Sequence, residues 1–176
     1  PLPKFRVDLL APFDDMQKAI EVVPHVMTES GIVPTAVEFM DSLSIKAAEM
    51  YLNSSLPHSD AAAYLIIELE GSSEEQVEAE YEAIGRLCME RGALEVYVAD
   101  NLATQDRIWK ARKCVAEALR VVSPVYCMED ITVPTSEIPE LLLAISQISR
   151  EHDVKIPAFG HAGDGNIHAT LLREGM

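Results

Sequence analysis

The 176-residue sequence has no long apolar run and few cysteines. Its longest uninterrupted apolar run is Ala61–Ile67, far shorter than the roughly 20 residues that a membrane-spanning helix needs. Cys88, Cys114 and Cys127 form an odd, sparse set without metal-type spacing, which indicates reduced thiols. No basic segment followed by an apolar stretch opens the chain, so a secretory leader is not expected. We expect a cytoplasmic protein without a transmembrane segment.

Positive charge is also scarce. Lys and Arg number 14 against 29 Asp and Glu, which gives a formal net charge of −15. A nucleic-acid partner would require clustered Lys and Arg, so this class of partner is excluded. Hydrophobic residues make up 48% of the chain and charged residues 24%, which is ordinary for one globular domain spanning 1–176. The first residue is Pro1 and not Met, which suggests a piece of a longer protein.

The turn after the first expected strand lacks glycine. A doubly wound parallel sheet that binds a dinucleotide places a Gly-rich phosphate-binding turn there. This sequence instead has Ala11-Pro12-Phe13-Asp14-Asp15 at that place. We therefore expect the chain to be unable to bind a dinucleotide by itself.

Apolar periodicity predicts strands that alternate with helices. The expected strands are 5–11, 36–41, 61–70, 95–99, 126–133, 154–159 and 167–172. The expected helices are 14–30, 42–54, a helix from 72 or 73 up to Gly92, 104–121 and 136–152. Pro24 should kink or divide the first helix. This order favours an α+β fold with helices on one face of a mainly antiparallel sheet, built from split βαβ units of ferredoxin type. A doubly wound parallel sheet is the alternative.

The segment Gly160–His168 is the richest in chemistry. Asp164-Gly165 between two apolar strands is typical of a type I′ hairpin turn, which would place His161 directly opposite His168. A longer loop from Ala162 to Ile167 is the alternative, and it would still place the two histidines at its two ends. Two imidazoles on the same face of a hairpin suit either one divalent metal or one substrate oxygen. A structural hairpin with two exposed histidines is the alternative.

Two histidines alone make an incomplete metal site, because a catalytic zinc usually has three protein ligands. Glu129, Asp130 and Asp164 are candidates for a third ligand, although none has a compelling spacing. For Glu129 and Asp130, an exposed or capping carboxylate is the favoured interpretation.

Two further segments contain candidate substrate ligands. Trp109, Arg112 and Ala116 fall on one line of a helix. We expect Arg112 beside the indole at the edge of the core, where its guanidinium could hold a carboxylate with two hydrogen bonds. A surface Arg packed on Trp109 is the alternative. Tyr126, in the strand before Pro134, could offer its phenol to a substrate.

Three motifs in this order resemble the C-terminal domain of FAD-linked oxidases. They are Trp109-x-x-Arg112-Lys113, Ser123-Pro-x-Tyr-Cys-Met128 and His161-x-Gly-Asp-Gly-Asn-x-His168. The resemblance covers essentially the whole chain, more weakly before about Asp100. That family includes the glycolate oxidase FAD subunit, D-lactate dehydrogenases and D-2-hydroxyglutarate dehydrogenase.

The resemblance implies a domain that caps the flavin and binds a small 2-hydroxy acid, glycolate or D-lactate. FAD would be bound mainly by an N-terminal domain outside this chain, and other oxidase subunits and a peripheral place at the inner membrane are further expectations. Arg112 would hold the carboxylate, and Asn166 would lie beside the substrate. His161 and His168 would ligate a divalent metal such as zinc, or one of them would act as the catalytic base.

The sequence departs from the family pattern at two points. The third metal ligand of the family is a Glu in a Glu-His-Gly segment farther downstream, and the sequence reaches Met176 without one. The Lys that some relatives have before the Asp of the third strand is not evident near Asp130, which favours a small acid over a dicarboxylate.

A non-catalytic ferredoxin-like module that binds a ligand or metal, or mediates oligomerisation, is the alternative function. Alone, the chain is expected to have no turnover.

Overall fold

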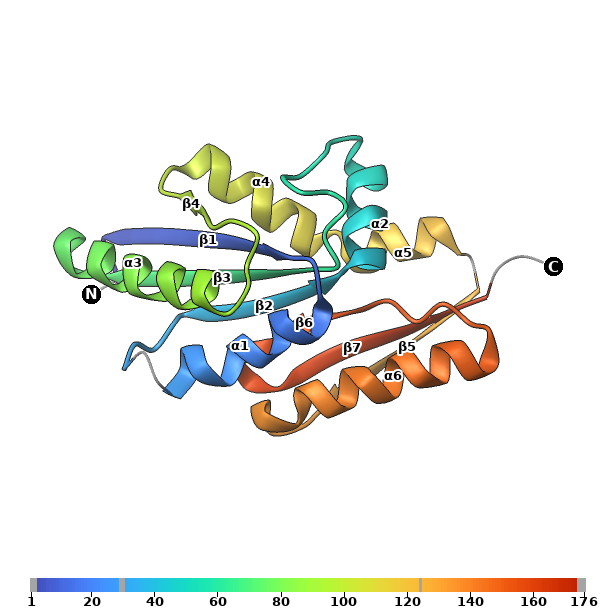
Figure 1. Ribbon diagram of the computed structural model, residues 1–176. Coiled ribbons are helices and arrows are strands. Elements are labelled where there is room, and N and C mark those ends of the chain that lie inside the picture. The colour runs from blue at the N-terminus through green and yellow to red at the C-terminus, as the bar shows by residue number, and fades with distance from the viewer. Residues whose placement is uncertain (1–2, 29–30, 124, 174–176) are drawn as a thin grey trace.

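Seven strands form a single sheet in which all paired strands are antiparallel. The computed structural model describes residues 3–28, 31–123 and 125–173, so Ser30 and Pro124, which belonged to predicted segments, lie outside the described residues. The order across the sheet is β4-β1-β3-β2-β6-β7-β5 (Figure 1). The strands are β1 (Phe5–Phe13), β2 (Ala36–Asp41), β3 (Ala63–Gly71), β4 (Tyr97–Ala99), β5 (Tyr126–Thr132), β6 (Ala158–His161) and β7 (Asn166–Leu172). The antiparallel pairing confirms the α+β prediction and excludes the doubly wound parallel sheet.

The strand order contains the ferredoxin-like arrangement that the sequence predicts. The elements β1-α1-β2-β3-α3-β4 give the sheet order β4-β1-β3-β2. The elements β5-α6-β6-β7 repeat the beginning of that unit, because β7 lies between β5 and β6 as β3 lies between β1 and β2. The two units join where β2 pairs with β6. The helices are α1 (Met16–Thr28), α2 (Ser42–Leu52), α3 (Glu74–Glu90), α4 (Leu102–Lys113), α5 (Val115–Val122) and α6 (Ile138–His152).

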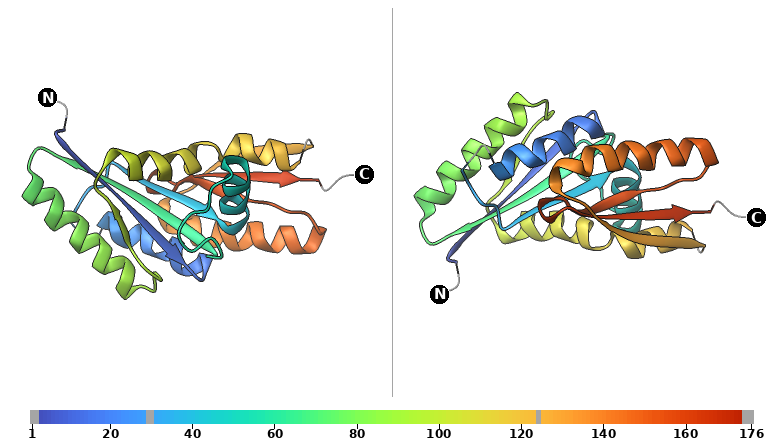
Figure 2. Two further views of the ribbon diagram at one scale, coloured as in Figure 1. Left: turned by 90° about the horizontal axis from the view of Figure 1, so that it is seen from above. Right: turned by 90° about the horizontal axis from the view of Figure 1, so that it is seen from below.

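Helices cover both faces of the sheet, so the expectation of helices on one face is wrong. The helices α1, α3 and α6 lie side by side over one face, and α2, α4 and α5 cover the other (Figures 1 and 2). The physical reason is that the central strand is apolar on both sides. The sheet therefore has a hydrophobic core on each face: the first core lies under α1, α3 and α6, and the second core lies under α2, α4 and α5. In β3, Leu65 and Ile67 belong to the first core, and Tyr64 and Ile66 belong to the second core.

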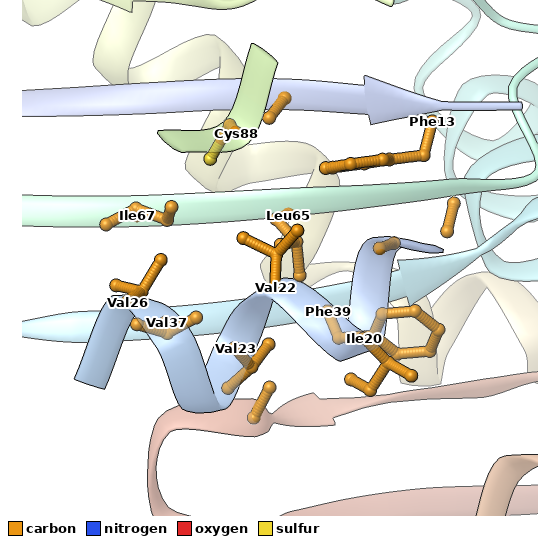
Figure 3. Packing of buried hydrophobic residues seen from close by; sticks show 14 of the residues in the cluster. Phe13, Ile20, Val22, Val23, Val26, Val37, Phe39, Leu65, Ile67 and Cys88 are labelled. Carbon is orange, nitrogen blue, oxygen red and sulfur yellow. The ribbon is translucent and has the colours of Figure 1, made fainter. Parts of the chain in front are cut away.

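The first core is built largely from α1 and the strands beneath it. Figure 3 shows Val22 and Val26 of α1 in the same cluster as Leu65 and Ile67 of β3. Pro24 lies inside α1 and does not divide the helix. A kink of α1 at Pro24 stays a prediction.

No helix in the described ranges is long and apolar enough to cross a membrane.

Several predicted boundaries differ from the structure, most of them by one or two residues. The single helix 104–121 is wrong, because the segment is divided at Cys114 into α4 and α5. The apolar stripe continues across this break, with Ala111 and Val115 both buried, so periodicity could not reveal it. The strand 154–159 begins later, at Ala158. Strand β1 continues through Pro12. Only Asp8–Leu10 of β1 pair with β4, so the missing backbone N–H of Pro12 does not interrupt that pairing.

Candidate active site

The Gly-rich hairpin positions the two predicted histidines. Strand β6 ends at His161, a 3-10 turn occupies Ala162–Asp164, and Gly165 has a φ of 82° before β7 begins. The predicted two-residue turn is therefore wrong. The turn has four residues because buried Ala162 belongs to the first core, and Gly165 alone has the left-handed conformation.

The longer turn changes the pairing but keeps the face. His161 lies opposite Asn166, and His168 lies opposite Phe159, so the predicted direct pairing of the two histidines is wrong. The shift is two positions, and side chains alternate with period two, so both rings still lie on one face. Their ring centroids are 5.8 Å apart with an interplanar angle of 77°, which confirms the prediction that the imidazoles converge.

Each imidazole contacts a carboxylate through the same ring nitrogen. The Nδ1 atom of His161 lies 2.7 Å from Oε1 of Glu38, and Nδ1 of His168 contacts Oδ1 of Asp130. An ionised carboxylate can only accept a hydrogen bond, so Nδ1 is the donor in both rings. In each neutral imidazole, Nε2 then has the free lone pair that a proton or a metal ion needs.

Arg112, on α4, contacts the other oxygen of the Glu38 carboxylate. Its Nε donates a hydrogen bond to Oε2 of Glu38 at 2.9 Å, and its Nη2 lies 2.8 Å from that oxygen. The guanidinium carbon lies 5.1 Å from the centroid of the Phe159 ring. Arg112 is buried at 7% exposure. The predicted neighbour, Trp109, is not its partner, so both the expected Arg–indole pair and the alternative of a surface Arg on Trp109 are wrong.

Trp109 belongs to a separate polar cluster. Its Nε1 donates to Oδ2 of Asp8 at 2.9 Å. Arg6 also pairs with Asp8, and with Glu68 at 2.6 Å. Burial raises the pKa of the Asp8 and Glu68 carboxyls, although Arg6 opposes this in both. This cluster connects α4 to β1 and β3.

Two buried polar atoms of this site have no hydrogen-bond partner in the described residues. They are Nη2 of Arg112 and Oδ1 of Asn166. The contact of Nη2 with Glu38 is close enough for an ion pair, but its angles are not those of a hydrogen bond. Buried polar atoms usually have partners, so two such atoms beside one histidine pair indicate a place for a polar ligand.

Several predicted residues are not brought to the histidine pair. Tyr126 lies opposite Leu172 and packs under Arg120, with 5.3 Å from the guanidinium carbon to the ring centroid. It is four residues from Asp130 on the same strand, roughly 13 Å along β5. Its role as a substrate ligand stays a prediction.

The expected third metal ligand is also not found among the described residues. Glu129 accepts a contact from the Cys127 thiol, and Asp164 accepts a hydrogen bond from the Asn166 backbone. No group of three or more His, Cys, Asp or Glu that could hold a metal occurs in the part of the chain that is described.

Sequence reasoning missed Glu38, which joins Arg112 to His161. The available signal was a charged residue in the otherwise apolar run Ala36–Met40. A charge at the centre of a buried strand requires partners, and here both partners are site residues.

The comparisons with known proteins identify the family. The model for "FAD linked oxidases, C-terminal domain" matches residues 2–175. The chain belongs to this family. It is 36% identical over 172 residues to the "Glycolate oxidase subunit GlcD" of Escherichia coli (strain K12), covering 98% of this chain and 34% of that protein. It is 32% identical over 181 residues to the "D-lactate dehydrogenase" of Anaerostipes hadrus, covering 100% of this chain and 38% of that protein.

Solved structures of low sequence identity share the fold. A p-cresol methylhydroxylase structure with bound substrate superimposes with a TM-score of 0.68 at 13% identity, over 97% of this chain and 39% of that chain. The FAD-linked oxidase domain described here thus spans about a third of the length of the curated relatives and structures that it matches.

Proposed function

We propose that this chain is the substrate-side domain of a longer flavin-dependent oxidoreductase that oxidises glycolate or D-lactate to the 2-oxo acid. The observation that carries the proposal is the pair of Nε2 atoms on His161 and His168 beside two unpartnered buried atoms, Nη2 of Arg112 and Oδ1 of Asn166. A 2-hydroxy acid needs a cation for its carboxylate and an acceptor for its hydroxyl proton. Both are present on one face of the hairpin.

Each side chain has a defined task in this proposal. Arg112 binds the substrate carboxylate through Nη2, and Asn166 orients the hydroxyl group. The Nε2 atom of His161 or His168 accepts the hydroxyl proton. An N-terminal domain outside this sequence would hold most of the FAD, which would supply the hydride acceptor for the substrate carbon. One proton and one hydride leave the substrate, which gives the 2-oxo acid.

The same two Nε2 atoms fit a divalent metal such as zinc. They supply two nitrogen donors, each oriented by a carboxylate on the other ring nitrogen, as is usual for metal-binding histidines. A bound metal would act as a Lewis acid and lower the pKa of the substrate hydroxyl. A third protein ligand would have to come from outside the described residues.

The charge balance of the site favours a substrate with a single carboxylate. Arg112 already shares its charge with Glu38, and Asp130 adds a second negative charge beside His168. A second substrate carboxylate would therefore meet more negative than positive groups.

We also infer a cytoplasmic protein, with a peripheral place at the inner membrane and other oxidase subunits as partners.

The experiment that tests this function is a turnover assay on the full-length protein that contains this chain. We expect reduction of an artificial electron acceptor with glycolate or D-lactate, and much less with 2-hydroxyglutarate. A flavin-loaded full-length protein that oxidises none of these acids would overturn the proposal and favour the non-catalytic module.

A further inference from the structure

Glu38 is buried in the middle of β2, where its neighbours Val37 and Phe39 are also buried. Its exposure is 5%. A carboxylate in such surroundings is costly unless all its lone pairs find charged or polar donors. The partners that it has found are two residues of the proposed active site.

The two carboxylate oxygens have separate partners. Oε1 accepts from Nδ1 of His161 at 2.7 Å, while Oε2 accepts from Nε of Arg112 at 2.9 Å. Glu38 is also the direct cross-strand partner of His161. It therefore lies between α4 and the hairpin, at the junction of the two ferredoxin-like units.

This arrangement fixes the proton of His161 as well as its ring. The Nδ1 atom must donate because Oε1 can only accept, so Nε2 is the acceptor that faces away from Glu38. On the other side, Oε2 occupies Nε of Arg112 and leaves the hydrogens of Nη2 without an acceptor. A single carboxylate thus prepares a proton acceptor and a carboxylate-binding donor together.

We propose that Glu38 is a positioning residue that sets the tautomer of His161 and the orientation of Arg112. The proposal rests on the proposed function, because it names the group that prepares two of its residues. Asp130 is a weaker counterpart, since the side chain with which it contacts His168 is 67% exposed.

The substitution Glu38→Gln gives an opposite tautomer. Arg112 has only donors, so the amide oxygen of the new side chain must face it. The amide NH2 then faces His161 and can only donate, so Nδ1 becomes the acceptor and Nε2 becomes protonated. The glutamine has nearly the same shape as Glu38, and the ring loses its free Nε2 lone pair without leaving its place.

The first measurement is the ¹⁵N spectrum of histidine-labelled full-length protein, with His161 assigned by the loss of its signals in His161→Gln. We expect a protonated Nδ1 and an unprotonated Nε2 in the neutral ring of the unsubstituted protein, and the reverse in Glu38→Gln. The control Glu140→Gln, an exposed carboxylate on α6, should leave the tautomer unchanged. The tautomer of His161 in the unsubstituted protein can be measured whether or not Glu38→Gln folds.

The second measurement separates this role from a purely structural one. We expect Glu38→Gln to lower kcat by roughly a hundredfold through the loss of the base, while KM changes by less than about threefold because Arg112 keeps its place. A protonated Nε2 in the unsubstituted protein, or an unchanged tautomer in Glu38→Gln, overturns the assignment of Glu38. The expected tautomers in a flavin-loaded protein without turnover would support Glu38 as the positioning residue and overturn the proposed function alone.

Discussion

The side chain of Asp41 accepts a hydrogen bond from the backbone nitrogen of Ala158 at 2.7 Å. Its other oxygen accepts from the backbone nitrogen of Ser44 at 2.8 Å and so caps α2. Asp41 therefore joins the end of β2 to the beginning of β6, three residues before His161. Burial raises the pKa of this carboxyl from 3.8 to about 6.

This raised pKa predicts a specific pH dependence of stability. The folded state binds the Asp41 proton more tightly than the unfolded state, so its contribution is complete below about pH 4 and is lost as pH rises to about 6. Asp41→Asn cannot ionise. As pH rises from about 4 to about 6, the unsubstituted chain should lose free energy of unfolding that Asp41→Asn keeps. The free energy of unfolding of Asp41→Asn, relative to that of the unsubstituted chain, should therefore rise by on the order of 2 kcal/mol across that window.

Urea unfolding of both chains at pH 4 and pH 7, followed by circular dichroism, measures this difference. Asp15→Asn is the control, because exposed Asp15 also accepts a backbone hydrogen bond, from Gln17. A difference that stays constant with pH would contradict the burial argument for Asp41.

The hairpin turn gives a prediction on stability alone. Gly165 has a φ of 82°, and an added Cβ would lie 1.9 Å from the carbonyl oxygen of Val133. Gly165→Ala must therefore displace backbone as well as adopt a strained conformation, and we expect it to cost more than about 2 kcal/mol. Gly31 has a φ of 67° with nothing within 4 Å of the added Cβ, so Gly31→Ala should cost only about 1 kcal/mol. Equal losses in thermal unfolding would mean that the Val133 contact has no effect.

The fold was largely predictable because strand alternation and helical periodicity are local properties of the sequence. The break at Cys114 and the second layer of helices were not, since both depend on what α4 and α5 pack against. The face shared by His161 and His168 could be predicted, but their pairing could not. It depends on whether Ala162 is buried in the first core, which no local pattern states. Glu38 was missed because its importance arises from Arg112, 74 residues away in sequence.

Arg112 should contribute to substrate binding in the full-length protein. Arg112→Lys keeps the positive charge but loses Nε and the planar fork, so it cannot hold Glu38 and a substrate carboxylate together. We expect kcat/KM for glycolate or D-lactate to fall by about tenfold or more, which is about 1.4 kcal/mol per decade. Arg107→Lys, an exposed substitution on the same helix, should leave kcat/KM unchanged. If both variants match the unsubstituted protein, Arg112 has only a structural role with Glu38.

The 176-residue chain alone should bind no FAD and show no turnover. Strand β1 continues through Pro12 and Phe13, and the Asp14-Asp15 turn that follows lacks the glycines that cradle a phosphate. The sheet is also antiparallel throughout the described strands. We expect the purified chain to be colourless, with no flavin absorbance after incubation with FAD and removal of the excess. A chain that retains a bound-flavin spectrum would show that this domain holds the cofactor by itself.

The last prediction concerns the metal. His161 and His168 offer two Nε2 atoms on one face, but no third ligand lies with them among the described residues. Zinc should therefore bind the 176-residue chain weakly, and the binding should be lost in His161→Ala and in His168→Ala, because one remaining imidazole cannot retain the ion. His152→Ala, at the exposed end of α6, is the matched control and should bind zinc like the unsubstituted chain. Calorimetric titration of the four chains measures this. Equal zinc binding in all four would place the ion elsewhere, and no binding in any of them would favour the histidines as proton acceptors in the proposed reaction.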